Sequence, residues 1–243
     1  MRLLVPVVLA AACGRFGFEQ HGGGTDAPGD TGDGAAAGVV TWVKTFAAQG
    51  NSASTLGDSF AGSATAGDAV VLQLFCANTV VPTGVTLTAS GWSFVQLGAL
   101  VGSTSSGYWG TSFGAIAPDS ASTTFTATWT AASPCTFIVE LGDELAGVDT
   151  SGAFDAHAEL LSNGNCATTV LTASANDAIW AACTVNDVTS TGAGFTKSAD
   201  DGHGDWSEYK LTTDPAGTPE GVLFQTSTGM DDYVVTAVAI KPG

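Results

Sequence analysis

The chain of 243 residues has few basic residues: 6 Lys and Arg stand against 23 Asp and Glu, which gives a formal net charge of −17. No Arg follows Arg15, and the Lys residues beyond it are scattered. A nucleic-acid surface needs clustered cations that displace counterions from phosphates. The sequence therefore argues against a nucleic-acid partner and is typical of a soluble, acidic surface.

The chain also lacks segments in which apolar residues recur at the 3.6-residue spacing of a helix. Val, Thr, Phe and Trp recur instead in short alternating runs, which are separated by turn residues that include many of the 32 Gly. Such runs predict antiparallel strands packed as a sandwich. We expect an all-β domain of about twelve strands over residues 39–243.

Residues 1–12 have the form of an export signal that is too short to span a bilayer. Arg2 is followed by an apolar stretch that ends in small residues before Cys13. Ala10-Ala11-Ala12-Cys13 resembles the lipobox of bacterial lipoproteins, and Gly14-Arg15-Phe16-Gly17-Phe18 resembles the start of many myxobacterial lipoproteins. The resemblance implies cleavage before Cys13, lipid on that cysteine, and a place at the outer membrane or cell surface. The alternative is an ordinary secretory signal with an incidental Cys.

Residues 13–38 predict a flexible acidic tether, because the Gly-rich segment from Gln20 onward has almost no side chains with which to bury surface. Asp26, Asp30 and Asp33 do not have the alternating spacing of a calcium-binding loop. We therefore interpret these carboxylates as part of a solvated linker.

One stretch of the chain returns about a hundred residues later. Gly67 to Asn78 reads GDAVVLQLFCAN, and Asn176 to Asn186 reads NDAIWAACTVN. Each opens with Asp, continues as an apolar strand that we expect to be covered on both faces, and closes on Asn at a turn. This echo predicts two pseudo-repeated halves, at about 55–148 and 166–243.

Several short motifs carry a family resemblance over residues 39–243. They are Gly67-Asp68, Gly91-Trp92, Tyr108-Trp109, Thr124-Phe125-Thr126 and Lys241-Pro242. The pattern resembles a jelly-roll-like β-sandwich domain found in secreted bacterial and phage-associated proteins. The resemblance implies a jelly-roll-like fold and no defined catalytic set.

The cysteines other than Cys13 form an even set, Cys76, Cys135, Cys166 and Cys183, which predicts two disulfides in an exported protein. Four cysteines allow three connectivities. Cys76 and Cys135 both point inward from expected strands of the first half, so we pair them, which leaves Cys166 with Cys183. A zinc site would need tighter spacing.

Two further patterns could carry catalysis. Residues 110–114 read GTSFG and match GxSxG, but the motif lies inside an expected strand with no following helix, where a nucleophilic serine needs a strand-to-helix elbow. Asp155, His157 and Glu159 alternate along an extended segment and could share one face. We interpret this segment as a solvated connector between the halves, and we predict no catalytic residues.

The densest group of oxygen ligands lies in a Gly-rich loop and comprises Asp200, Asp201, Asp205 and Glu208. Calcium prefers such hard ligands, so this loop is a candidate calcium site; an ordinary exposed acidic turn is the alternative. Trp206 adjoins the loop and is the tryptophan that we expect to be exposed, where it could contact a ligand.

Together these features predict a membrane-anchored surface lipoprotein without a required cofactor. Its sandwich would act as a passive binding or structural module for a glycan or protein ligand. The alternatives are a hydrolase that acts on glycans through paired carboxylates and a structural subunit of the envelope or an appendage.

Overall fold

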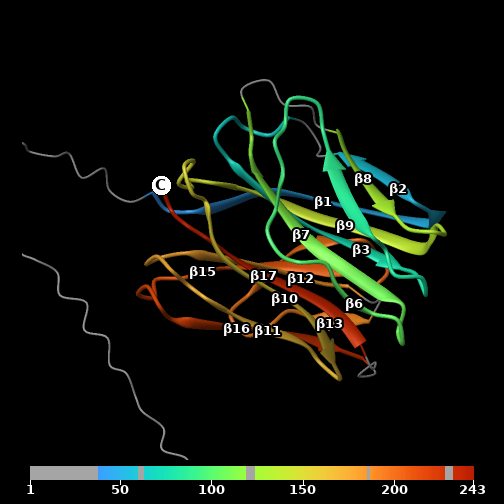
Figure 1. Ribbon diagram of the computed structural model, residues 1–243. Coiled ribbons are helices and arrows are strands. Elements are labelled where there is room, and N and C mark those ends of the chain that lie inside the picture. The colour runs from blue at the N-terminus through green and yellow to red at the C-terminus, as the bar shows by residue number, and fades with distance from the viewer. Residues whose placement is uncertain (1–37, 60–62, 119–123, 185–186, 228–231) are drawn as a thin grey trace, which may run out of the picture. The chain divides into compact units, whose positions relative to one another are not determined.

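The computed structural model describes residues 38–59, 63–118, 124–184, 187–227 and 232–243. These residues form strands and turns, and no helix occurs among them (Figure 1). The described part of the chain therefore contains no helix that could cross a membrane. The expected all-β fold is confirmed, whereas the expected signal and all of the tether before Gly38 lie outside the described residues.

The strands pair antiparallel throughout. The first half of the described chain contains β1 (Thr41–Ala53), β2 (Thr55–Ser59), β3 (Ala69–Ala77), β4 (Gly84–Thr88), β5 (Val95–Gln96), β6 (Val101–Ser103), β7 (Tyr108–Ile116), β8 (Thr124–Thr130) and β9 (Cys135–Ala146). The second half contains β10 (Phe154–Asn163), β11 (Cys166–Leu171), β12 (Ala178–Thr184), β13 (Val188–Ser190), β14 (Thr196–Asp200), β15 (Trp206–Leu211), β16 (Pro219–Thr226) and β17 (Asp232–Ile240).

The described chain thus has seventeen strands, where the sequence predicted about twelve. The difference comes from short strands at the sheet edges, such as β5 with two residues and β6 with three. So few residues cannot show the alternation by which a strand is recognised in a sequence.

Each half consists of a large sheet and a small sheet, and the strand order corresponds between the halves. In the first half the large sheet runs β1-β9-β3-β7-β5, with β6 also paired to β7, and the small sheet runs β2-β8-β4. In the second half the large sheet runs β10-β17-β12-β15-β14 and the small sheet β11-β16-β13. The correspondence includes β1 and β10. The jelly-roll assignment and the pseudo-repeats at about 55–148 and 166–243 stay predictions.

The pairing register corresponds as well. In β1 the register shifts directly after Trp42, which lies opposite Leu145. In β10 it shifts directly after Phe154, which lies opposite Ile240. Leu145 and Ile240 each lie opposite the first residue of the central strand of their sheet, β3 or β12. Trp42 and Phe154 therefore hold the same position in the two halves.

The four sheets stack face to face, with the two large sheets in the middle and a small sheet outside each of them (Figure 1). On β3, Val70, Leu72 and Leu74 face the small sheet of their own half, whereas Val71 and Phe75 face the second half. Strands β3 and β12 are buried along nearly their whole length, as predicted.

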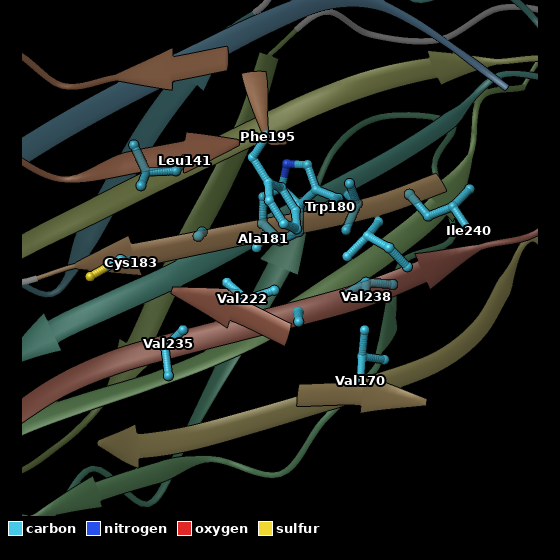
Figure 2. Packing of buried hydrophobic residues seen from close by; sticks show 14 of the residues in the cluster. Leu141, Val170, Trp180, Ala181, Cys183, Phe195, Val222, Val235, Val238 and Ile240 are labelled. Carbon is cyan, nitrogen blue, oxygen red and sulfur yellow. The ribbon is translucent and has the colours of Figure 1, made fainter. Parts of the chain in front are cut away.

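The larger core joins the two halves and continues to the outer small sheet of the second half. Figure 2 shows part of it, with Trp180 on β12 of the second half and Leu141 on β9 of the first half in the same cluster. Trp180 is the largest of the fully buried side chains. Because this core contains residues of both halves, separation of the halves would expose it, whereas the smaller core lies wholly within the first half.

A buried polar cluster also connects the large sheets. The Asp143 carboxylate on β9 is fully buried and accepts hydrogen bonds from Nε1 of Trp42 at 2.8 Å and of Trp180 at 2.5 Å. The hydroxyls of Ser198 and Ser207 donate to it at 2.8 Å each. Burial raises the pKa of the Asp143 carboxyl, and the four donors oppose that rise. A buried carboxylate without these donors would be costly, so the cluster favours one arrangement of the halves.

Candidate binding groove

The four cysteines of the domain form two disulfides with the expected partners. Cys76 on β3 is joined to Cys135 on the neighbouring strand β9, and Cys166 on β11 is joined to Cys183 on β12. The second disulfide connects the small and large sheets of its half. Cys13 lies outside the described residues, so lipid attachment stays a prediction.

The acidic loop from Asp200 to Glu208 is held by local contacts. Asp200 pairs with Lys197 Nζ at 2.5 Å. Asp201 Oδ1 accepts hydrogen bonds from the backbone N–H of His203 at 2.8 Å and of Asp205 at 3.1 Å. Contacts of this kind are typical of turns that begin with Asp.

Asp205 and Glu208 are fully buried, so the expectation of an exposed acidic turn is wrong for them. The reason is that β14 and β15 pair up to Asp200 and Trp206, which brings both ends of the loop into the sheet. Glu208 Oε2 accepts a hydrogen bond from the N–H of Gly192 at 2.8 Å, and burial raises the pKa of Glu208 to about 7. Among the described residues, no three or more His, Cys, Asp or Glu side chains lie where they could hold a metal ion. Calcium binding stays a prediction.

Trp206 is only half-exposed, because the Lys197 ammonium lies 3.5 Å from the centre of its ring. The more exposed tryptophan is Trp42, whose accessible fraction is 36%. The sequence placed Trp206 beside a flexible-looking loop, but the pairing of β14 with β15 covers one face of its ring.

Ser112 of the GTSFG motif lies on β7 and is fully buried. Its hydroxyl donates to Oε1 of Glu159 on β10. The other carboxylate oxygen of Glu159 lies 3.1 Å from Nδ1 of His157. The carboxylate therefore separates the serine from the imidazole, whereas activation of a serine nucleophile needs the base beside the hydroxyl.

The two glycines of the GTSFG motif allow the second half to approach β7 closely. A Cβ at Gly110 would lie 2.4 Å from Cγ1 of Val234, and one at Gly114 would lie 2.5 Å from the ring of Phe154. Contacts that short do not occur between side chains, so both positions need glycine for packing. The motif is thus explained by the contact between the halves.

The segment with Asp155, His157 and Glu159 is not a solvated connector but part of strand β10, which pairs with β17. Asp155 lies beside the fully buried Asp177, and burial followed by the charge of Asp155 raises the pKa of Asp177 to about 6. The alternation along this segment is too weak to predict a strand, because a register shift after Phe154 interrupts it.

An open groove lies where β10 of the second half crosses the edge of the first large sheet. Its volume is about 420 Å³, within the range of small-molecule sites. Its walls are mostly apolar, and the side chains of Val95, Leu97, Ile116 and Phe154 contribute most of them. Hydroxyls of Ser93, Thr150 and Ser151 also line it, and no charged side chain is among the described residues of its wall.

The turn that forms one wall of the groove is held in place by an ion pair. Asp149 Oδ1 accepts hydrogen bonds from the N–H and the hydroxyl of Ser151. Lys241 Nζ lies 2.8 Å from the other oxygen, Asp149 Oδ2. The hydrogen bonds from Lys241 and Ser151 hold the pKa of the Asp149 carboxyl far below its ordinary value. The wall is therefore preformed rather than assembled around a ligand.

The opposite wall is fixed to β7. The N–H of Leu97 donates to the carbonyl of Ser112 at 2.9 Å, and the side-chain amide of Gln96 donates to the Thr111 hydroxyl at 3.1 Å. Sequence reasoning missed the groove, because its residues come from three distant segments. Gly114 and Phe154 pack against each other in the groove wall, and no spacing in the sequence reveals this contact.

Comparison of the chain with protein-family models, curated proteins and solved structures finds no match.

Proposed function

We propose that the chain is an exported surface lipoprotein whose sandwich is a passive binding module, with the groove as its ligand site. The observation that supports binding is a contrast within the molecule. Ser112 and Glu159, which could have served catalysis, are engaged with each other between the halves, whereas the groove is open and rigidly framed. A preformed apolar site with a few hydroxyls is suited to holding a ligand rather than transforming it.

The N-terminal region supports the anchoring part of the proposal. Lipid at Cys13 would hold the chain in a membrane, and the first described residue lies 38 − 13 = 25 positions after that cysteine. A flexible Gly-rich chain of this length has a root-mean-square span of about 25–30 Å. The sandwich would therefore stand clear of the lipid headgroups and could turn its groove toward glycans or proteins nearby.

The anchoring part is tested by fractionating cells that express the full chain and its Cys13→Ser variant. We expect the native chain with the membranes and the variant in the soluble fraction. A native chain that stays soluble, with no lipid mass on its N-terminus, contradicts the anchor.

The binding part is tested by applying the soluble Cys13→Ser chain to a glycan array, with and without Val95→Asp. Val95 is 60% exposed at the rim of the groove, so the substitution should leave the fold intact. We expect a glycan to bind and the Asp variant to bind it at least about tenfold more weakly, because a carboxylate would have to be covered by the ligand. An affinity for the glycan that Val95→Asp leaves unchanged would mean that the groove is not the site.

A further inference from the structure

The register shift in β1 places a lysine against a fully buried carboxylate. Trp42 lies opposite Leu145 on β9. In a regular ladder Lys44 would then lie opposite Asp143, but the shift brings it opposite Glu144. Lys44 Nζ lies 3.1 Å from Glu144 Oε2, and the two side chains are 23% and 0% exposed. A bulge re-aims the side chains beside it, so this contact is built into the sheet.

The groups around the Glu144 carboxyl are those that an acyl transfer needs. Its Oε1 accepts a hydrogen bond from the backbone N–H of Thr65 at 2.7 Å. The buried Asp68 carboxyl is hydrogen-bonded to Glu144, and burial followed by this contact raises the pKa of Asp68 to about 6. Lys44 Nζ also donates to the Ser63 carbonyl at 2.5 Å, which holds the amine in place. A nucleophile, a carbonyl carbon, an N–H donor and an acid therefore meet at one buried point.

A second lysine pair of similar burial lacks the last two of these groups. Lys210 Nζ lies 2.7 Å from Glu220 Oε2, and the two side chains are 29% and 6% exposed. Among the residues that the structure describes, Lys210 is the one hydrogen-bond partner of the Glu220 side chain. The contact of an amine with a buried carboxylate is thus common to both pairs. Asp68 and the Thr65 N–H distinguish the pair in the first half.

We propose that Lys44 and Glu144 condense to an amide that joins β1 to β9 covalently. This modification goes beyond the proposed binding role. Lys44 Nζ is the nucleophile, Glu144 Cδ is the acceptor, and Asp68 is the group that moves the proton. One ammonium and one carboxylate become one amide and one water, so the reaction needs no oxidant, reductant or other reactant.

The protons and bonds balance in three steps. The Lys44 ammonium first gives a proton to Oε2 of Glu144 at 3.1 Å, since burial disfavours two separate charges. The free amine then bonds to Cδ, and the negative charge that develops on Oε1 is stabilised by the Thr65 N–H. Asp68 gives its proton to Oε2 and takes one from Nζ, the bond between Cδ and Oε2 breaks, and Oε2 leaves as water.

The position of the pair favours the amide over hydrolysis. Glu144 is fully buried, which keeps bulk water from its carbonyl carbon. The amine is held at contact, so the reaction is intramolecular and loses no translational freedom. The N–H that remains on Lys44 Nζ still has the Ser63 carbonyl as its acceptor.

The amide would secure the strand that follows the N-terminal region. Strand β1 begins three positions after Gly38, and among the described strands it pairs only with β9. In the proposed anchored protein, a pull from the membrane reaches the sandwich through this edge strand. With Lys44 bonded to Glu144, β1 could not be peeled from β9 beyond that point.

The test is mass spectrometry of the full Cys13→Ser chain after reduction, denaturation and digestion with trypsin. Trypsin cleaves after Lys and Arg, and Lys44 is the one such residue between Arg15 and Lys197. We expect no cleavage after Lys44, because an amide has replaced its amine. Residues 16–197 should therefore appear as a single peptide that is lighter than its sequence by one water.

Two buried aspartates provide matched variants. Asp68→Asn keeps a hydrogen bond to Glu144 but removes the acid, so the linked fraction should fall by about tenfold or more. Asp177→Asn is the control, since Asp177 precedes the central strand of the other half, and it should link as the parent chain does. Circular dichroism of both variants shows that they are folded. Complete cleavage after Lys210 in every sample controls for the digestion and for the second lysine pair.

Cleavage after Lys44, with peptides of the full sequence mass, would show an ordinary ion pair and overturn the proposal without any variant. A link that fragmentation places at a residue other than Glu144 would contradict the assigned acceptor. Equal linkage in Asp68→Asn and Asp177→Asn would contradict the assigned acid. The measurement involves neither the lipid nor the groove, so failure of the anchor or of ligand binding does not change its outcome.

Discussion

The two halves share strand order and register, yet the buried Asp before the central strand of each half lies beside a different second acid. Asp68 and Asp177 directly precede the first residues of β3 and β12, and burial raises the pKa of each to about 6. Beside Asp68 the second acid is Glu144 of β9, whereas beside Asp177 it is Asp155 of β10. The topology therefore determines where a buried acid lies, whereas its acidic neighbour comes from a different strand in each half.

The outer faces of the small sheets differ more than the interiors. On the first small sheet, threonines lie side by side across the strands, with Thr128 between Thr55 and Thr86 and Thr126 beside Thr88. On the second, Leu171 and Leu223 are exposed by 58% and 44%. Positions that face the other half are constrained by packing, whereas outward positions tolerate any residue that suits a pleated surface.

The largest expected difference between the halves concerns their disulfides. Cys76–Cys135 closes a loop of 59 positions and Cys166–Cys183 one of 17. Under the chain-entropy model, removal should lower the free energy of unfolding by about 4 kcal/mol for the first and about 3 kcal/mol for the second. Urea unfolding of the two double Cys→Ala variants measures both. A larger loss for the shorter loop would show that local packing, and not loop length, determines the cost.

Trp42 and Phe154, which hold the same position in the two halves, give the next comparison. Trp42→Ala should cost about 3 kcal/mol, because it removes a stacked ring and one hydrogen-bond donor from the buried Asp143. Phe154→Ala should cost about 1–2 kcal/mol, since it removes a half-exposed ring that packs on Gly114 but takes no hydrogen-bond donor from a buried carboxylate. Thermal unfolding of both variants ranks them. Equal costs would mean that the two positions contribute alike, although Trp42 stacks on Tyr209 and Phe154 packs on Gly114.

These comparisons also show which features the sequence could predict. The unbroken apolar runs of β3 and β12 predicted strands covered on both faces, because a strand buried on both faces needs apolar residues at consecutive positions. The disulfide partners followed from the inward direction of Cys76 and Cys135 on expected strands, which left Cys166 with Cys183. Features of this kind depend either on one short segment or on a small number of possible cysteine pairings.

The groove and the buried acids could not be predicted, for a shared physical reason. Val95, Ile116 and Phe154 belong to segments that meet only when the halves cross, so no single window of sequence contains the site. Asp205 looked like a loop residue by its Gly neighbours, and only the pairing of β14 with β15 takes it inside. Tertiary contact decided both outcomes.

Glycine at the interface between the halves can be compared with glycine on an outer face. Gly110→Ala should cost about 2 kcal/mol, because the new Cβ would lie 2.4 Å from Val234 and 3.2 Å from the Leu74 carbonyl. Gly221→Ala on β16 is the matched control, since no atom lies within 4 Å of its added Cβ. It should be neutral or slightly stabilising. Denaturant midpoints of both variants provide the measurement, and a costly Gly221→Ala would contradict the packing explanation.

A pH comparison follows from a position where the halves differ in charge. Glu208 lies opposite Ala181 on β12, and the corresponding residue of the first half is Phe113 opposite Leu72. Burial raises the pKa of Glu208 to about 7 from an ordinary value of 4.5. The folded state therefore binds the proton more tightly than the unfolded chain, so stability is highest in mild acid and falls as pH rises through about 7.

Glu208→Gln removes this titration while it keeps an oxygen for the Gly192 N–H. We expect the variant to gain about 1–2 kcal/mol over the native chain at pH 8 and to match it within error at pH 5. Denaturant unfolding across that range measures the gap. Asp68 and Asp177, with raised pKa values of about 6, remain in both proteins, so both should lose stability between about pH 4 and pH 6. A gap that does not change with pH would show that Glu208 is not the titrating group.

The smallest expected effect concerns calcium and the loop that distinguishes the second half. The corresponding turn of the first half, residues 103–107, contains only Ser, Thr and Gly, so of these two turns only the acidic loop offers carboxylates to calcium. Calcium takes six to eight oxygen ligands, and a cation bound to the folded state alone would raise the melting temperature with the logarithm of its concentration. Here Asp201 Oδ1 is occupied by two backbone N–H groups and Glu208 Oε2 by a third.

We therefore expect the melting temperature to stay flat when calcium replaces sodium at constant ionic strength. Asp200→Asn with Asp201→Asn should change this little, because both side chains serve the turn rather than a cation. Asp205 is left unchanged, since it is fully buried and its substitution would test folding instead. Any rise shared with sodium would reflect screening of the net charge of −17. A rise that is specific to calcium and lost in the double variant would place a metal site in this loop after all.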